Sequence, residues 1–335
     1  MDEICTVLIF VIGIICACLK WRMYVSETDE EVQCPTEKKR SDHPVMGHIL
    51  LWGPPGVGKT TLARVTSEEL GFAYGYCPKF IVRTPIALSS KRDLDQLVGE
   101  IEYGTVVFID EIHGLSSNVE EALYSLMQDF EYQGAGEVPK FTLIGATTRA
   151  GSLSKPILDR FRIEFELEEP SSDEVLSVLL DVKNGISSPV TMDEYHGQTA
   201  AKTIIKFHIA SLTMPDREPP DDILKMIAER SLGNPRIGKS LYEHVKAVTR
   251  VAEDKMDIKY AQEMLGLLGI DEMGMHRADR RVVQVFLDND NHPLGLETLA
   301  IMADVHKDDL QNVIEPRLMK LGILERTPAG RRLVE

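Results

Sequence analysis

The stretch "WGPPGVGKTTLARV", residues 52–65, constrains the fold of this chain more than any other part of the sequence. It fits the spacing G-x-x-x-x-G-K-[ST], follows the apolar run "HILLW" and precedes a segment of helical character. Glycines let backbone N–H groups approach a phosphate, and the first turn of a helix adds its positive dipole end. The motif therefore predicts a strand, a phosphate-binding loop and a helix, in that order.

The same loop predicts ATP and Mg²⁺ as ligands. Lys59 is expected to reach the terminal phosphates, and Thr60 is expected to offer its hydroxyl to Mg²⁺. A purely structural glycine-rich turn is the alternative, and the strand–loop–helix context argues against it. The expected nucleotide contacts are Gly53, Pro54, Pro55, Gly56, Val57, Gly58, Lys59, Thr60 and Thr61.

Two adjacent acids follow the next apolar run, "TVVFID". Asp110 and Glu111 would lie at the carboxyl end of a buried strand, where parallel sheets bind their ligands. We expect Asp110 to hold Mg²⁺ through water and Glu111 to orient and deprotonate the attacking water. A solvated strand end is the alternative. In "FTLIGATT", Thr147 or Thr148 can bond the γ-phosphate or the water; we favour Thr148, against a threonine that only caps the strand.

Apolar runs alternate with helix-like segments from residue 46 to 170, which predicts a three-layer α/β domain: a parallel sheet with helices on both faces. Helical periodicity alone continues over 171–272 and predicts a helical lid subdomain. The pattern over residues 273–335 predicts helices followed by a hairpin, "ILERTPAGRRLV", and this order of elements predicts a winged helix. The expected helices lie near 91–102, 119–129, 172–183, 200–212, 221–231, 236–253, 258–268, 278–288, 295–304 and 307–321.

Residues 1–45 combine an uncharged apolar run, 4–19, with a polar linker. As a helix the run reaches roughly 24 Å, less than the roughly 30 Å of a bilayer core. Lys20 and Arg22 follow it, so a membrane anchor would leave the rest of the chain in the cytoplasm. The alternatives are an upstream start codon, with Met23 or Met46 opening the protein, or a buried helix.

The net charge of −16 argues against a protein that coats nucleic acid over its whole surface. The C-terminal end is nevertheless basic. Arg326, Arg331 and Arg332 lie in the expected hairpin, where a wing can contact DNA phosphates without reading sequence. An exposed basic hairpin without a binding role is the alternative.

From about residue 48 to 182, and again from about 221 to the end, the sequence resembles the RuvB family, hexameric AAA+ ATPases that drive the bacterial Holliday-junction branch-migration complex. The resemblance rests on several long runs in the same order rather than on the phosphate loop alone. These runs are "HILLWGPPGVGKTTLA", "VFIDEIHGLSSNVEEALY", "FTLIGATTRAGSLSKPILDRF", "GNPRIGKSL" and "IEPRLMKLGILERTPAGR".

The resemblance implies three further roles. Thr148 would be sensor 1, Arg160 the arginine finger that acts on the ATP of a neighbouring subunit, and Arg236 sensor 2. The guanidinium of Arg160 is always charged and can donate two parallel hydrogen bonds, which suits the role of an arginine finger. A salt bridge from Arg160 to Asp159 or Glu164 is the alternative. Arg236 starts a helix, where the dipole disfavours a cation and an anionic ligand would compensate; a solvated arginine is the alternative.

The resemblance thus implies an ATP-hydrolysing DNA motor that drives branch migration in recombination and repair. It would act on a four-way junction or duplex, as a hexameric ring, with a RuvA-like partner. A membrane-tethered AAA+ remodeller or a clamp-loader-like ATPase is the alternative, favoured by the apolar run 4–19. A third hypothesis is a DNA-binding module in which ATP only switches the conformation. The presence of Glu111 and Arg160, which are suited to hydrolysis, argues against it.

Three departures from the family pattern qualify the expectation. Only "EYQGAGEVPK" stands where the family has a longer hairpin that docks on RuvA, and Ala329 replaces a usual arginine of the wing. The N-terminal adenine-side box is missing, yet residues 192–211 resemble it within the lid. This segment either lines the adenine pocket, with Tyr195 or Gln198 near the base, or matches by chance, which we favour.

Overall fold

A parallel five-stranded sheet is the centre of the computed structural model, which describes residues 45–74, 78–132, 136–170, 172, 174–176, 179, 198–252 and 256–334. The strand order in this described part is β2-β3-β6-β1-β7. All four neighbouring pairs run parallel, so every strand presents its carboxyl end at the same edge. The strands are β1 (Ile49–Trp52), β2 (Phe80–Arg83), β3 (Val106–Ile109), β6 (Thr142–Thr147) and β7 (Ile163–Glu166).

Alternate residues of β1 show that both faces of the sheet are covered. Ile49 and Leu51 pack in the hydrophobic cluster that includes α3, whereas Leu50 packs in the cluster that includes α4, α5 and α6. A strand buried on both sides has no polar face, which is why the central runs are continuously apolar. The covering helices are α3 (Lys59–Tyr74), α4 (Lys91–Glu100), α5 (Ser117–Asp129) and α6 (Lys155–Leu158).

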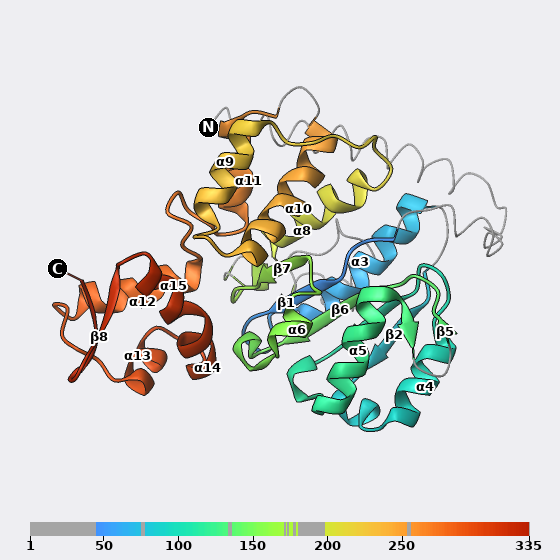
Figure 1. Ribbon diagram of the computed structural model, residues 1–335, viewed down its shortest axis with the longest axis horizontal. Coiled ribbons are helices and arrows are strands. Elements are labelled where there is room, and N and C mark those ends of the chain that lie inside the picture. The colour runs from blue at the N-terminus through green and yellow to red at the C-terminus, as the bar shows by residue number, and fades with distance from the viewer. Residues whose placement is uncertain are drawn as a thin grey trace.

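The helical subdomain packs on the α3 side of the sheet, and the cluster of its helices is continuous with that of the sheet. Helix α8 contacts both α3 and α10, so it lies between the α/β domain and the rest of the helical subdomain (Figure 1). Most of the helix expected near 172–183 lies outside the described residues. The described lid helices are α8 (Thr199–Ser211), α9 (Asp221–Arg230), α10 (Pro235–Ala252) and α11 (Ile258–Leu267).

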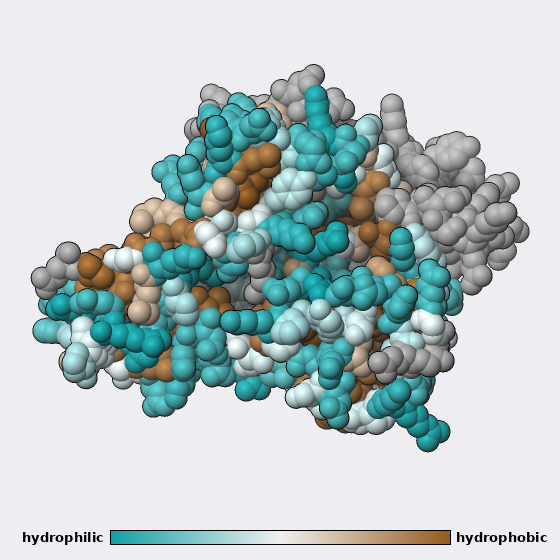
Figure 2. Space-filling view, in the orientation of Figure 1, coloured by the Kyte–Doolittle hydropathy of each residue, from teal (hydrophilic) through white to brown (hydrophobic). Residues whose placement is uncertain are grey.

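The C-terminal unit has its own hydrophobic cluster and projects from one side of the molecule (Figure 1). An antiparallel hairpin follows its helices, as expected for a winged helix. Leu287, Ile301 and Met302 of this unit are exposed, and apolar side chains break the hydrophilic surface at that end of the molecule (Figure 2). The elements are α12 (Arg277–Asp288), α13 (Leu296–Met302), α14 (Lys307–Asp309), α15 (Glu315–Lys320), β8 (Leu324–Thr327) and β9 (Gly330–Leu333).

The helix expected near 307–321 is present as a continuous helical stretch over residues 307–320, but it is not a regular α-helix. A π-helical segment, Leu310–Ile314, separates α14 from α15. Pro316 lies in the first turn of α15 and has no backbone N–H to donate to the preceding turn. A wider turn accommodates this loss of the regular ladder, as π-bulges commonly do.

Two further predictions concern the periphery. The segment "EYQGAGEVPK" forms a minimal hairpin whose strands, β4 (Glu131–Tyr132) and β5 (Gly136–Glu137), have two residues each. In the part of the chain that the structure describes, no helix is both long and apolar enough to cross a membrane. The apolar run 4–19 and the linker after it lie outside the described residues.

Candidate active site

The phosphate loop connects β1 to α3 at the carboxyl edge of the sheet. Gly53, Gly56 and Gly58 all have a positive φ, of 149°, 80° and 88°, a conformation that other residues rarely adopt. At Gly53 space is also limiting, because a Cβ would lie 2.2 Å from the carbonyl oxygen of Leu167. These glycines therefore determine the path of the loop around the place where phosphates are expected.

Lys59 is buried under this loop. Its Nζ donates hydrogen bonds to the carbonyl oxygens of Gly53, at 2.8 Å, and Pro54, at 2.6 Å. Burial lowers the pKa of the Lys59 ammonium, and the carboxylates of Glu111 and Asp110 oppose that shift. The ammonium thus lies in the field of both acids, in a position where phosphate oxygens can replace the two carbonyls.

Asp110 and Glu111 follow β3 directly, at the same edge as the loop. Glu111 has a left-handed backbone, with φ 48°, and its N–H donates to Asp110 Oδ1 at 3.1 Å. A non-glycine residue in this region costs free energy and is typical of functional turns. Asp110, together with the exposed Thr60 hydroxyl, offers the hard oxygen donors that Mg²⁺ prefers. Among the described residues no group of three or more His, Cys, Asp or Glu side chains could hold a metal by itself.

Glu111 is tied to the end of the neighbouring strand. Its Oε2 accepts hydrogen bonds from the backbone N–H and the hydroxyl of Thr148, both at 3.1 Å. His113 Nδ1 lies 3.1 Å from the same oxygen. Glu111 and Thr148 were expected at this site from the sequence, whereas His113 was not, although the histidine follows the two acids in "DEIH".

Arg160 follows α6 and lies against α5. Its Nη2 donates to the Tyr124 hydroxyl and to Gln128 Oε1, and its guanidinium lies 4.4 Å from the centroid of the Tyr124 ring. Its buried Nε has no hydrogen-bond partner among the described residues. The contacts of Arg160 with Tyr124 and Gln128 were not expected from the sequence. The only sequence signal is the spacing of four residues, which places Tyr124 and Gln128 on the same face of one helix.

Arg236 is the second residue of α10, as the expected helix start requires, and its side chain lies outside the described residues. Gln198 precedes α8. Its amide nitrogen donates to the carbonyl oxygen of Glu168 at 2.6 Å and of Val57, in the phosphate loop, at 3.4 Å. The structure therefore brings this part of the segment 192–211 to the nucleotide loop, while Tyr195 lies outside the described residues.

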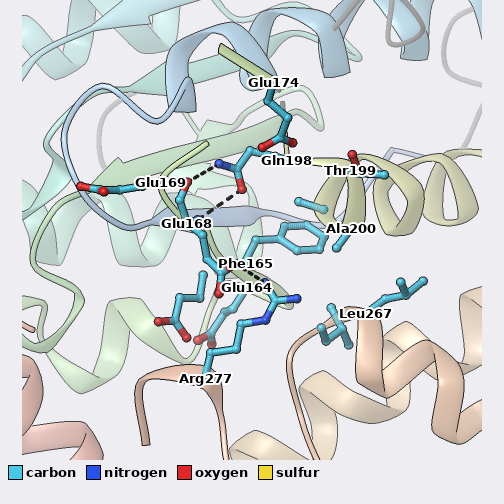
Figure 3. Close-up of a pocket in the computed structure, with 13 residues that line it drawn as sticks. Glu164, Phe165, Glu168, Glu169, Glu174, Gln198, Thr199, Ala200, Leu267 and Arg277 are labelled. Atoms are coloured by element: carbon cyan, nitrogen blue, oxygen red, sulfur yellow. Dashed lines mark hydrogen bonds and ion pairs between the residues drawn. The ribbon is translucent and has the colours of Figure 1, made fainter. Parts of the chain in front are cut away.

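Gln198 also lines a cavity of about 240 Å³ between β7, the start of α8 and the first turn of α12 (Figure 3). The carboxylates of Glu164 and Glu166 come from β7, and Arg277 reaches in from α12 to pair with Glu168 at 3.1 Å. The cavity thus lies where the ATPase core, the lid and the winged helix meet.

The three hairpin arginines all have carboxylate partners. Arg326 Nε and Arg331 Nε bind Glu315 Oε1, a carboxylate that is 1% exposed, the second of them at 3.1 Å. Arg332 Nε binds Glu325 Oε1 at 2.6 Å. The Arg326 side chain remains 54% exposed and that of Arg331 only 20%, so the first retains more surface for a further ligand.

Two family models match this chain. The Holliday junction DNA helicase RuvB P-loop domain matches residues 23–167, and the RuvB C-terminal winged helix domain matches residues 272–335. These matches include the phosphate loop, the Asp110–Glu111 pair and the hairpin arginines.

Curated relatives match over most of the chain. The Holliday junction branch migration complex subunit RuvB of Ligilactobacillus salivarius is 35% identical over 323 residues, which cover 92% of this chain and 84% of the relative. The subunit of the same name from Nitratiruptor sp. is 34% identical over 306 residues, covering 88% and 80%. Among solved structures, the Thermotoga maritima RuvB Holliday junction branch migration motor is 33% identical, covers 89% of this chain and 88% of that chain, and has a TM-score of 0.37.

Proposed function

This chain belongs to the RuvB family, and from that premise we propose that it is an ATP-hydrolysing motor that moves the branch point of Holliday junctions in DNA recombination and repair. The chain spans most of the length of its curated relatives. The family models match both the domain that contains the nucleotide loop and the winged-helix domain.

The chemistry at the nucleotide follows from the carboxyl edge of the sheet. Mg²⁺-bound ATP supplies the phosphoanhydride bond that is cleaved. Lys59 would exchange its two loop carbonyls for phosphate oxygens, Thr60 would offer its hydroxyl to the metal, and Asp110 would hold the metal through water. Glu111 accepts the proton of the attacking water, and Thr148 holds that carboxylate in place. The observation that carries the proposal is the pair of hydrogen bonds from Thr148, after β6, to Glu111, after β3, at the sheet edge that also holds the buried Lys59 of the phosphate loop.

Glu111→Gln tests the proposal, because the amide keeps the shape of the carboxylate but cannot accept the proton. We expect the variant to bind ATP and to turn it over at least about a hundredfold more slowly. ATPase rates measured with and without a four-way DNA junction extend the test to the motor: a junction-specific rise in the wild type is expected. Full turnover in Glu111→Gln would contradict the assignment of the base.

A ring, hexameric as in the family resemblance, is the assembly that we propose, with Arg160 completing the site of a neighbouring subunit. A delivered arginine stabilises the charge of the transition state and is worth about 10³- to 10⁵-fold in rate. Support comes from the place of this guanidinium, which lies on α5 with an unsatisfied buried Nε and has Gln128 at an exposed position beside it. Arg236, at the start of α10, would contact the phosphates from the lid side.

Mixing two inactive variants tests the shared site. Glu111→Gln protomers keep Arg160, and Arg160→Ala protomers keep Glu111, so a mixed ring contains interfaces with one intact copy of each group. We expect each variant alone to lack turnover and the mixture to regain part of it. A mixture as inactive as its components, at concentrations where both assemble, would refute the action of Arg160 across an interface.

DNA is proposed to bind at the hairpin through phosphate contacts from Arg326, Arg331 and Arg332. Such contacts are independent of sequence, as a motor that passes over any sequence requires. A RuvA-like partner is a separate proposal. The minimal β4–β5 hairpin offers little surface for it, so a pull-down of the full chain with a RuvA protein, with and without junction DNA, is the direct test.

A further inference from the structure

Two donors of Thr148 and one ring nitrogen of His113 surround one oxygen of the catalytic carboxylate. The N–H and hydroxyl of Thr148 and the ring nitrogen Nδ1 of His113 all lie 3.1 Å from Glu111 Oε2. An ionised carboxylate has about four acceptor positions over its two oxygens. With Oε2 occupied by the two donors of Thr148 and with His113 Nδ1 beside it, Oε1 is the oxygen left to take a proton from water.

The contacts of His113 determine which of its nitrogens carries the proton. Arg149 donates to Nε2 from both Nε, at 3.1 Å, and Nη2, at 2.6 Å. A guanidinium has no acceptor, so Nε2 must be unprotonated and the hydrogen must lie on Nδ1. Nδ1–H then donates its hydrogen bond to the Thr147 hydroxyl oxygen, which is 2.9 Å away, and Glu111 Oε2 lies 3.1 Å from the same nitrogen.

The surroundings of the ring favour this neutral form. The His113 side chain is only 10% exposed. Burial lowers the pKa of the imidazole, the charge of Arg149 lowers it further, Glu111 opposes the shift, and His306 adds to the lowering. Thr147 also accepts the N–H of Arg149 at 2.9 Å, which fixes the start of the arginine relative to the ring.

We propose that His113 is a positioning residue for ATP hydrolysis: its Nδ1–H, held by Thr147 and 3.1 Å from Glu111 Oε2, attracts the carboxylate of Glu111 and keeps it in place for water activation, and Arg149 selects the required tautomer. The inference rests on the proposed function, since it assigns a role relative to the general base. The histidine itself does not touch the nucleotide in this role. It acts through Glu111, which would otherwise be held only by the neighbouring Thr148 from one side.

Single-site kinetics at saturating Mg·ATP test the role. A hydrogen bond to a charged group that is realised in the reactive geometry corresponds to about a ten- to hundredfold change in rate. We therefore expect His113→Ala to lower kcat by about that factor while leaving the KM and the Kd of a fluorescent ATP analogue near their wild-type values. A merely structural role would change binding and thermal stability together with kcat. His292→Ala, an exposed histidine in the winged helix, is the matched control and is expected to leave basal turnover unchanged.

Rescue and coupling sharpen the test. His113→Asn places an amide N–H near the position of Nδ1 and is expected to recover much of the rate lost in His113→Ala. Arg149→Gln is expected to lower kcat less than His113→Ala. Adding Arg149→Gln to His113→Ala should cause no further loss, because the arginine acts through the ring.

Three results would overturn the inference: unchanged or increased kcat in a folded His113→Ala variant, no recovery in His113→Asn, or additive losses in the double variant. An increase would mean that the histidine holds Glu111 in a resting position. Glu111→Gln separates this failure from that of the proposed function. Inactive Glu111→Gln beside fully active His113→Ala rejects only the positioning role, whereas turnover in Glu111→Gln rejects the function on which it rests.

Discussion

Glu166 couples the stability of this protein to pH at the junction between the ATPase core and the winged helix. It lies in β7, its side chain is 8% exposed, and Arg281 of α12 approaches it at 3.5 Å. Burial raises the pKa of this carboxyl from 4.5 to about 7; Arg281 opposes the rise, and Asp279 and Glu168 add to it. The attraction of one half-exposed arginine therefore does not compensate for the lost hydration of the carboxylate.

The size and sign of the effect follow from that shift. Each pKa unit corresponds to about 1.4 kcal/mol, so keeping Glu166 ionised in the folded protein costs roughly 3 kcal/mol. The folded state binds more protons than the unfolded state between the two pKa values of 4.5 and about 7. Stability is therefore greatest, for this group, below its unfolded pKa and decreases as the pH rises through the folded pKa. Glu166→Gln, which is neutral at every pH, removes this dependence.

Thermal denaturation of wild type and Glu166→Gln at about pH 5.5 and about pH 8 measures the effect. We expect the advantage of the variant in unfolding free energy to grow by about 2 kcal/mol between these conditions. Glu169→Gln is the matched control: it removes an exposed carboxylate that lines the same cavity and is expected to change stability by less than about 1 kcal/mol. An equal difference between wild type and Glu166→Gln at both pH values would refute the reasoning.

The remaining predictions concern the ligands. Gly53→Ala is expected to abolish tight ATP binding, because its Cβ would lie 2.2 Å from the carbonyl oxygen of Leu167; a nucleotide titration with wild-type Kd would contradict this. Gln198→Ala is expected to raise the KM for ATP severalfold by releasing the carbonyl of Val57, with kcat little changed; an unchanged KM would separate the lid segment from the nucleotide pocket. Arg326→Ala is expected to weaken junction binding and to reduce the slope of log affinity against log salt by about one; salt titrations with the same slope would show that this arginine contacts no phosphate.

The fold class could be predicted because its signals are local. The three central strands are buried on both faces, so β1, β3 and β6 appear in the sequence as uninterrupted apolar runs. The edge strands β2 and β7 were not predicted. In β7 the sequence "IEFE" alternates apolar and acidic residues, a weak pattern in four residues, and its pairing with β1 depends on a partner far away in the chain.

In the candidate site, too, the features that depend on local sequence could be predicted and those that depend on distant residues could not. The spacing of the phosphate loop and the acidic pair after β3 indicated Lys59, Asp110 and Glu111, since each role depends on a few consecutive residues. The partners of Arg160 were not foreseen, because Tyr124 and Gln128 belong to another helix and reach the arginine only after α5 and α6 have packed on the same face of the sheet.

By itself the sequence determined which residues can bind a nucleotide, because glycines, a lysine and paired acids at fixed spacing can form a phosphate and metal site through local geometry alone. Only the tertiary structure decided which side chains surround these residues. Glu111 meets Thr148 and His113 meets Arg149 because β3 and β6 are adjacent and end at the same edge. Glu166 becomes a pH-sensitive group only when α12 covers β7. Such contacts join residues that are remote in sequence, and their energies depend on burial that exists only in the folded chain.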